Sequence, residues 1–177
     1  MFIVYLAGNS RENKDWIEKI KKEFGDFSDG EILYYKHWSE RKSFIDLEEE
    51  EKRLLELIKG KEDYFIFAKS VGTILALKSV YEGRIDPKKM ILCGHPYELA
   101  KKLNLPIDDY LRELKISTLF IQNEKDPLFS YKELEGVLLK NSPRDYKIIK
   151  IAENSTHDYE EYEKLKREVR SFIEVEN

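Results

Sequence analysis

The stretch YFIFAKSVGTILAL, Tyr64–Leu77, changes its hydrophobic spacing halfway along. Its first half, Tyr64–Phe67, is aromatic and β-branched, which is typical of a buried strand. The second half carries apolar residues at helical spacing: Val71, Ile74, Leu75 and Leu77. A lysine, a serine and a glycine lie between the two patterns. The stretch therefore predicts a strand, a very tight turn and a helix, with the hydroxyl of Ser70 at the apex.

The same alternation of strand and helix continues along the whole chain. The predicted strands are Phe2–Ala7, Ile32–Tyr35, Tyr64–Phe67, Met90–Cys93, Thr118–Gln122 and Tyr146–Ile151. The predicted helices are Glu12–Phe24, Phe44–Ile58, a third ending near Gly83, Tyr97–Leu114 interrupted by Pro106, Tyr131–Leu139 and Asp158–Ile173. Alternation of this kind predicts an α/β fold of three layers, with a six-stranded, mostly parallel, doubly wound sheet between two helical layers. Sites in such sheets lie beyond the carboxyl ends of the strands.

Length and composition limit the classes of protein to consider. The chain has 177 residues, 41% of them hydrophobic and 37% charged, and a net charge of −4. We therefore expect a single globular domain over residues 1–177. No basic block appears, so nucleic acid is not an expected partner. The acidic run Asp46–Glu51 is interpreted as the start of a helix, where acids favour the dipole.

Cysteine content and the first residues bear on the compartment. Cys93 is the single cysteine, which excludes a disulfide within the chain and favours a cytoplasmic location. The apolar N-terminus MFIVYLAGNS has no basic leader and is too short to span a bilayer, so we interpret it as the first strand. We accordingly expect no membrane association.

The turn after the third predicted strand has the features of a nucleophile elbow. Such an elbow needs small residues two positions before and after the serine, and Ala68 and Gly72 occupy those positions around Ser70. The alternative is a serine that only caps a helix. A phosphate-binding P-loop would need glycines at positions 63 and 68, where Asp63 and Ala68 stand, and is rejected. The first loop, AGNSRENK, also lacks the glycines of a dinucleotide-binding turn.

A serine nucleophile needs a base, and the chain has three histidines. His37 is interpreted as a surface or packing residue. His95 follows the fourth predicted strand and is a candidate for lining a site. His157 follows the sixth predicted strand and is the candidate base, against the alternative of a polar residue at a helix start.

The base in turn needs a carboxylate that holds its tautomer. The loop after the fifth predicted strand offers Asp126, stiffened by Pro127, and also Glu124. Asp158 adjoins the histidine but is usually interpreted as a surface acid. The favoured set is therefore Ser70, Asp126 and His157, each beyond a separate parallel strand, in the Ser, Asp, His order of α/β-hydrolases.

The whole chain resembles small, single-domain α/β-hydrolases, similar to the short dienelactone-hydrolase-like and retinoblastoma-binding-type serine hydrolases. The motifs that carry the resemblance are AKSVG, IQNEKDPLF and NSTHDYEEY. It implies strand order 2-1-3-4-5-6, a minimal fold without a lid domain, no cofactor and no metal.

The resemblance also implies an oxyanion hole. Its donors would be the backbone amides of Val71 and of Asn9, with Gly8 and Ser10 as neighbours that contact substrate. The chain departs from the family at Ala68, where glycine is usual, and at Ala7-Gly8, where many relatives have His-Gly.

The expected activity is hydrolysis of a carboxylic ester or thioester through an acyl-enzyme on Ser70, with a small-molecule acyl substrate. Lys69, Lys36 and His95 are candidates for holding an acidic group of that substrate. Two alternatives stay open at this point. One is an acyltransferase, which differs in excluding water, and the other is a binding module that keeps the fold without catalysis.

Overall fold

A computed structural model of the protein describes residues 1–40 and 42–175, so positions 41, 176 and 177 of the predicted domain lie outside the described residues. The strands are β1 (Phe2–Leu6), β2 (Asp29–Leu33), β3 (Phe65–Lys69), β4 (Lys89–Cys93), β5 (Ser117–Gln122) and β6 (Tyr146–Lys150). The helices are α1 (Asn13–Glu23), α2 (Leu47–Ile58), α3 (Val71–Tyr81), α4 (Tyr97–Lys102), α5 (Ile107–Arg112), α6 (Tyr131–Asn141) and α7 (Tyr162–Glu174), with one 3₁₀ turn, Lys36–Trp38.

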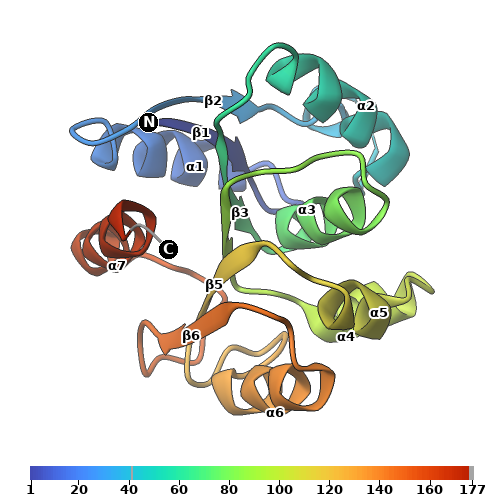
Figure 1. Ribbon diagram of the computed structural model, residues 1–177, viewed down its shortest axis with the longest axis vertical. Helices are drawn as coiled ribbons and strands as arrows, with labels where there is room; N and C mark the ends of the chain where they lie inside the picture. Colours follow the sequence, from blue (N-terminus) through green and yellow to red (C-terminus); the bar gives the residue numbers. More distant parts are fainter. Residues whose placement is uncertain (41, 176–177) are drawn as a thin grey trace.

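The six strands form one parallel sheet in the order β2-β1-β3-β4-β5-β6, which confirms the predicted fold class and strand order. Figure 1 shows the three layers, with α1 and α7 on one face of the sheet and the remaining helices on the other. The central strands β4 and β5 are buried along their whole length, because helices cover both of their faces. Within the described residues, no helix has the combination of length and apolar character needed to cross a membrane.

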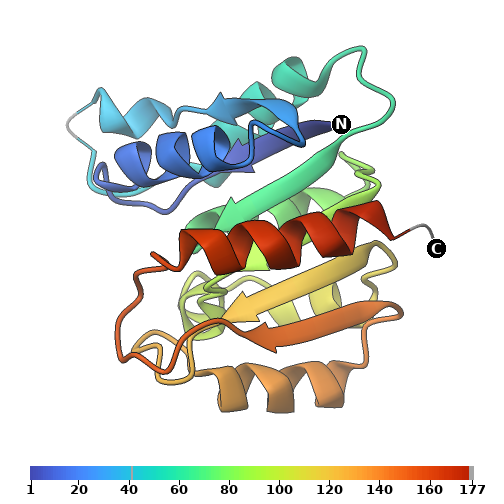
Figure 2. The same cartoon turned by 90° about the vertical axis from the view of Figure 1, so that its left-hand side faces the viewer.

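All strands run in the same direction, so their carboxyl ends share one edge of the sheet (Figure 2). The loops that follow β1, β3, β5 and β6 therefore meet at this edge, and they carry most of the residues predicted to act in a site. The order of strands makes β1 and β3 direct neighbours, with Leu6 paired to Ala68. The loop after β1 and the turn after β3 consequently lie side by side.

The second strand lies earlier in the sequence than the predicted Ile32–Tyr35. Strand β2 begins at Asp29, which pairs with Phe2, and ends at Leu33. The polar start of this strand carries no hydrophobic signal, because it lies at the edge of the sheet, where Asp29 and Glu31 face solvent. Gly30 fits there because a Cβ at this position would lie 2.0 Å from the carbonyl oxygen of Ile3.

Two helices start later than predicted. Helix α2 begins at Leu47 rather than Phe44, because the side chain of Asp46 accepts hydrogen bonds from the amides of Glu48 (3.2 Å) and Glu49 (3.1 Å) and so caps the helix. The acidic run therefore does start a helix, as predicted. Helix α7 begins at Tyr162 rather than Asp158, which leaves residues 152–161 as the irregular loop that carries His157.

The connection between β4 and β5 forms the two short helices α4 and α5, with Pro106 at the cap of α5. Helix α5 packs against α3 and α6 and so completes the helical layer on that face of the sheet. The described chain has no additional lid domain at this point, which agrees with the prediction of a minimal fold.

The start of α3 approaches the end of β1 so closely that the chain needs glycine there. A Cβ built on Gly72 would lie 2.6 Å from the carbonyl oxygen of Ala7 and 2.9 Å from that of Leu6. Backbone atoms of a central strand have little freedom to move aside. The small residue that the sequence places two positions after Ser70 is therefore required by this contact.

Substituting the two helical glycines with alanine should have opposite effects on stability. Gly72→Ala should lower the free energy of unfolding by about 1–3 kcal/mol, because the new methyl overlaps a strand carbonyl. Gly136→Ala is the matched control, since Gly136 is exposed on α6 and a Cβ there meets nothing within 4 Å. It should raise stability by about 0.5–1 kcal/mol through helix propensity. Urea unfolding of both variants measures this, and a neutral Gly72→Ala would contradict the close approach.

Candidate active site

Ser70 occupies the apex of the turn between β3 and α3 in a strained backbone conformation. Its φ is 52° and its ψ is −124°, a region that residues other than glycine rarely adopt. The side chain of Ser70 makes no capping hydrogen bond to α3, so the alternative of a helix-capping serine is not what the structure shows. The amide of Ser70 donates to the carbonyl of Cys93 at 2.9 Å, which ties the apex to the end of β4.

A buried chain of hydrogen bonds holds the carbonyl group of Ser70. Thr73 Oγ1 donates to this carbonyl oxygen at 2.6 Å and therefore accepts its bond with His95 Nδ1, at 2.7 Å, from the ring N–H. Burial lowers the pKa of His95 to about 3, so the ring is neutral near pH 7. This corrects the interpretation of His95 as a residue that lines the site, because its side chain is fully buried behind the turn.

Asp126 is the carboxylate that meets His157, through a 2.7 Å contact between Oδ2 and Nδ1. The same Oδ2 accepts the hydroxyl of Tyr159 at 2.6 Å, and Oδ1 accepts the amide of Leu128 at 2.9 Å. The side chain of Asp126 is completely buried. Glu124, the other acid of this loop, forms an ion pair with Lys150 instead.

Side chains add to two backbone hydrogen bonds, from Glu124 N to Ala152 O and from Lys125 N to Asn154 O, in holding the loop that carries His157. Asn123 Nδ2 donates to the carbonyl oxygens of Thr156 (3.1 Å) and Asp158 (2.9 Å), the two residues that flank His157. The hydroxyl of Tyr159 also accepts the amide of Asn123 at 3.2 Å. Both residues lie within the motifs quoted above, yet sequence reasoning assigned them no role, because their contacts join loops 36 residues apart.

The ring of His157 lies against Gly94, at the end of β4, where the backbone of Cys93 is hydrogen-bonded to Ser70. A Cβ built on Gly94 would lie 2.9 Å from His157 Cε1, and Gly94 directly follows Cys93, whose carbonyl binds the Ser70 amide. His157 Nε2 is buried and has no hydrogen-bond partner among the described residues. The structure thus brings Asp126 and His157 into direct contact. It places Ser70 close by, without a hydrogen bond between Oγ and Nε2, which is common in substrate-free sites.

Asn9 is held rigidly in the loop after β1. Its carbonyl oxygen accepts from His37 Nε2 at 2.8 Å and from Trp38 Nε1 at 2.9 Å. Its side chain accepts from the amide of Ile45 at 2.9 Å and donates to the carbonyl of Ser43 at 3.0 Å. Within the described chain, no acceptor binds the backbone amide of Asn9. His37 is therefore a support of this loop, buried rather than exposed, and Trp38 shares that role.

The other residues predicted near the oxyanion hole occupy the same edge of the sheet. Val71 is the first residue of α3, so its amide belongs to the unpaired N–H groups of a helix start. Gly8 is buried beneath the side chain of Asn13, which would lie 2.6 Å from a Cβ at that position. Ser10 is exposed, and its hydroxyl accepts a hydrogen bond from Asn13 Nδ2 at 2.8 Å.

Lys69 is buried instead of presenting its ammonium to solvent. Its Nζ lies 4.6 Å from the centre of the Trp16 ring, and 5% of the residue is exposed. Burial lowers the pKa of Lys69, and nearby carboxylates, including Asp158 and Asp126, oppose that shift. This corrects the expectation of a surface lysine able to hold an acidic substrate group.

Two other kinds of reactive group are alternatives to Ser70: the single cysteine, and a cluster of side chains able to bind a metal. Burial raises the pKa of the Cys93 thiol far above its usual range, so this group stays protonated and unreactive. Across residues 1–40 and 42–175, no group of three or more His, Cys, Asp or Glu side chains has the arrangement of a metal site. The described residues around Ser70 therefore offer a hydroxyl, an imidazole and a carboxylate.

Solved structures share this fold at low sequence identity. The chain superposes on a protein described as a YdeN-like hydrolase from Pectobacterium atrosepticum with a TM-score of 0.72 and 16% identity, covering 97% of this chain and 90% of that one. RedJ, a thioesterase from Streptomyces coelicolor, matches with a TM-score of 0.65 and 13% identity over 97% of this chain and 84% of its own.

An uncharacterized protein from Bacillus cereus matches with a TM-score of 0.73 and 17% identity over 98% of this chain, which spans 60% of the length of that protein. Esterases also occur among the matching structures. No family model matches the sequence, and no curated protein sequence matches it. At these identities the likeness establishes the α/β-hydrolase fold, in agreement with the predicted fold class.

The neutral state of His95 should make folding stability depend on pH. The folded pKa of about 3 lies below the ordinary value of 6.5, so the unfolded chain binds the extra proton and stability falls as the pH drops below 6.5. Between pH 7 and pH 5, this residue should remove about 2 kcal/mol of unfolding free energy. His95→Asn, which keeps an amide donor for Thr73, should lose that part of the pH dependence. Urea unfolding at pH 7 and pH 5 measures the change in unfolding free energy. An equal change in the parent protein and in His95→Asn would contradict a neutral, buried His95.

Proposed function

We propose that this protein is a serine hydrolase that cleaves a carboxylic ester or thioester through an acyl-enzyme on Ser70. The observation that carries the proposal is the pairing of His157 with the buried Asp126 beside a strained serine turn. A serine that only shapes the fold would not need a left-handed backbone, an uncommitted hydroxyl and a histidine with a free Nε2. The likeness to hydrolases, esterases and a thioesterase supports the same reaction class.

In the first step, Ser70 Oγ attacks the acyl carbon while His157 Nε2 accepts its proton. Asp126 faces Nδ1 of the same ring, so it keeps the proton on that nitrogen and stabilises the imidazolium that forms. The hydroxyl of Tyr159 and the amide of Leu128 hold the carboxylate in this orientation. His157 then gives the proton to the departing alcohol or thiol, which leaves the acyl group on Ser70.

The negative charge on the attacked carbonyl oxygen is stabilised by the backbone amides of Val71 and Asn9. The contact of Gly72 with the carbonyl of Ala7 supports this assignment, because it brings the first residues of α3 against the loop that continues into Asn9. Fixed donors of this kind typically contribute about 3 kcal/mol each to the barrier reduction. In the second step, water attacks the acyl carbon while His157 Nε2 takes one of its protons. His157 then returns this proton to Ser70 Oγ as the bond to the acyl carbon breaks, which releases the carboxylic acid.

Ser70 should be the serine that reacts with a fluorophosphonate probe. The intact protein should acquire one adduct on the peptide containing Ser70, and Ser70→Ala should abolish both the adduct and ester turnover. Ser171→Ala, on the exposed face of α7, is the matched control and should label like the parent protein. Equal labelling of Ser70→Ala, measured by mass spectrometry, would favour the non-catalytic binding module instead.

Asp126→Asn should reduce ester turnover by orders of magnitude, about 10⁴-fold in the serine protease precedent, while the circular dichroism spectrum stays unchanged. The reason is that an amide facing His157 Nδ1 favours the wrong tautomer. Asp158→Asn removes the neighbouring acid, whose side chain forms no hydrogen bond or ion pair with the ring in the described chain, and should leave turnover within a few-fold. The reverse ranking, measured with p-nitrophenyl acetate, would overturn the proposed role of Asp126.

A further inference from the structure

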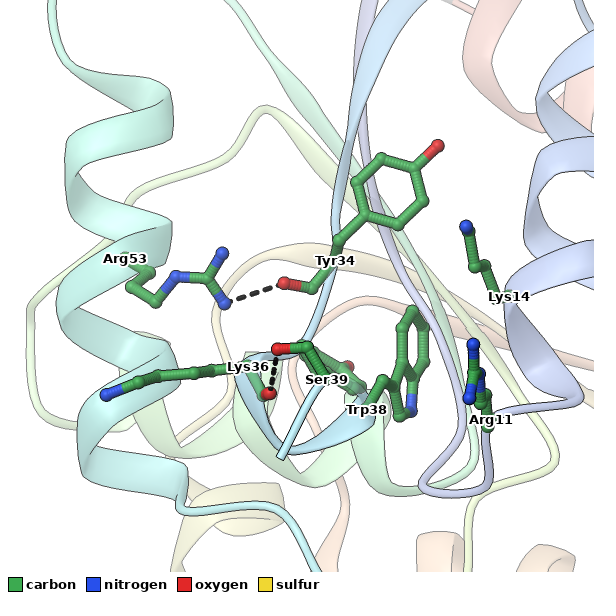
Figure 3. A pocket seen from close by; sticks show the side chains of 8 residues that line it. Arg11, Lys14, Tyr34, Lys36, Trp38, Ser39 and Arg53 are labelled. Atoms are coloured by element: carbon green, nitrogen blue, oxygen red, sulfur yellow. Dashed lines mark hydrogen bonds between the residues drawn. The ribbon is translucent and has the colours of Figure 1, made fainter. Parts of the chain in front are cut away.

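A hollow of about 370 Å³ lies beside the candidate active site, over the carboxyl ends of β1 and β2 (Figure 3). Its walls include four cationic side chains and two large aromatic rings: Arg11, Lys14, Lys36, Arg53, Tyr34 and Trp38. No carboxylate is among its lining residues. The whole chain carries a net charge of −4, so this local excess of cations runs against the composition of the protein.

Acidic neighbours already neutralise the two cations on one side of the hollow. Lys36 Nζ pairs with Glu49 and, at 3.5 Å, with Glu40. Arg53 Nη1 lies 2.6 Å from Glu50 Oε2 and also donates to the carbonyl oxygen of Tyr34. Lys36 and Arg53 therefore line the hollow with charges that carboxylates of the protein already balance.

The two cations on the opposite side have no such partner. In the part of the chain that the structure describes, neither Arg11 nor Lys14 forms an ion pair with a carboxylate. Arg11 comes from the loop before α1 and Lys14 from the first turn of α1, and both lie on the same side of Trp38 (Figure 3). Lys14 Nζ lies 5.5 Å from the centre of the Tyr34 ring. Arg11 interacts electrostatically with the adjacent Glu12, but neither cation is held in an ion pair, and both line the same hollow.

Trp38 lies beside these cations and is bonded to the loop after β1. Its Nε1 donates to the carbonyl oxygen of Asn9 at 2.9 Å, so the indole is fixed in place from behind. The ring of Tyr35 packs on it at 5.0 Å between centroids. A fixed aromatic plane beside two cations suits a ligand that combines a planar or apolar part with a strongly charged group.

We propose that this hollow is an anion-binding subsite for a ligand that carries a phosphate group. A phosphate monoester has a charge of about −1.5 to −2 at pH 7, which matches the two free cations, whereas a single carboxylate would neutralise one of them. The guanidinium of Arg11 binds two phosphate oxygens side by side, and the ammonium of Lys14 binds as a point charge. Trp38 packs against the adjoining part of the ligand.

The position of the hollow links the bound phosphate to the proposed reaction. Neighbouring strands lie roughly 5 Å apart, and β3, which carries Ser70 at its end, adjoins β1. A phosphate over β1 and β2 is then on the order of 10 Å from the acyl carbon, within reach of a leaving group a few bonds long. The phosphate belongs either to the substrate, which rests on the proposed hydrolase function, or to a separate ligand that contacts the Asn9 loop through Trp38.

Calorimetric titration with phenyl phosphate tests the subsite itself, without requiring turnover. The parent protein and Ser70→Ala should bind the probe alike, so failure of the hydrolase proposal leaves this test intact. Arg11→Gln/Lys14→Gln should weaken binding at least tenfold. Lys19→Gln/Lys22→Gln removes the same charge from α1 outside the lining of the hollow and should change the affinity less than twofold. No binding by the parent protein at millimolar probe, or equal losses in both double variants, would overturn the proposal.

Two esters with the same acyl group then identify the source of the phosphate. One has a phosphate on the leaving group, and the other replaces it with a hydroxyl. If the phosphate belongs to the substrate, Arg11→Gln/Lys14→Gln should reduce the ratio of kcat/KM for the phosphorylated over the neutral ester at least tenfold. If it belongs to a separate ligand, this ratio should stay within twofold while phenyl phosphate still binds. Both results are compatible with a phosphate subsite and differ only in the source of the phosphate. The titration with phenyl phosphate is the experiment that can overturn the subsite itself.

Discussion

The contact between Gly72 and the end of β1 is the constraint on which the candidate site depends. Two carbonyl oxygens at the end of β1 lie within 3 Å of a Cβ at this position, and the chain enters α3 through a tight turn in which Ser70 has a positive φ. That turn lifts the serine hydroxyl away from the helix it precedes. The same proximity sets the first amides of α3 beside the loop that contains Asn9. One close approach between a strand and a helix thus places Ser70, the proposed nucleophile, beside the proposed oxyanion donors, before any of the polar contacts are considered.

Polar side chains then fix what the backbone alone leaves free. The loop that carries His157 has no regular structure, yet Asn123 binds the carbonyls on both sides of the histidine, and Tyr159 joins this loop to Asp126. On the opposite side of the site, His37 and Trp38 hold the carbonyl of Asn9. These residues position the proposed site residues by holding the loops that carry them. Their burial explains how irregular loops keep a geometry that catalysis would need to within a fraction of an ångström.

The sequence predicts the parts of this structure that local patterns encode. Alternating strands and helices indicate the parallel sheet, and the small residues around Ser70 indicate the turn, because both depend on neighbours in the chain. The start of β2 escapes prediction, since an edge strand that begins Asp29-Gly30 has no hydrophobic period. The burial of His95 and Lys69 escapes it as well, because loop residues with the same sequence context can face either inward or outward. The role of Tyr159 has no local signal, because it depends on a hydroxyl that reaches Asp126 across 33 residues.

The way the Asp126 carboxylate is hydrogen-bonded determines how the candidate site responds to ionic strength. Its buried carboxylate is satisfied by an imidazole, a phenol and a backbone amide, and within the described chain no lysine or arginine pairs with it. Dissolved ions screen charges that water surrounds, over a Debye length of about 8 Å at physiological salt, but they do not enter this interior. The orientation of His157 is therefore indifferent to salt, unlike an arrangement built on exposed ion pairs. The cations that line the hollow beside Trp38 face solvent, so anions of an added salt compete with a bound ligand there. Salt should therefore affect binding in the hollow but leave the contact between Asp126 and His157 unchanged.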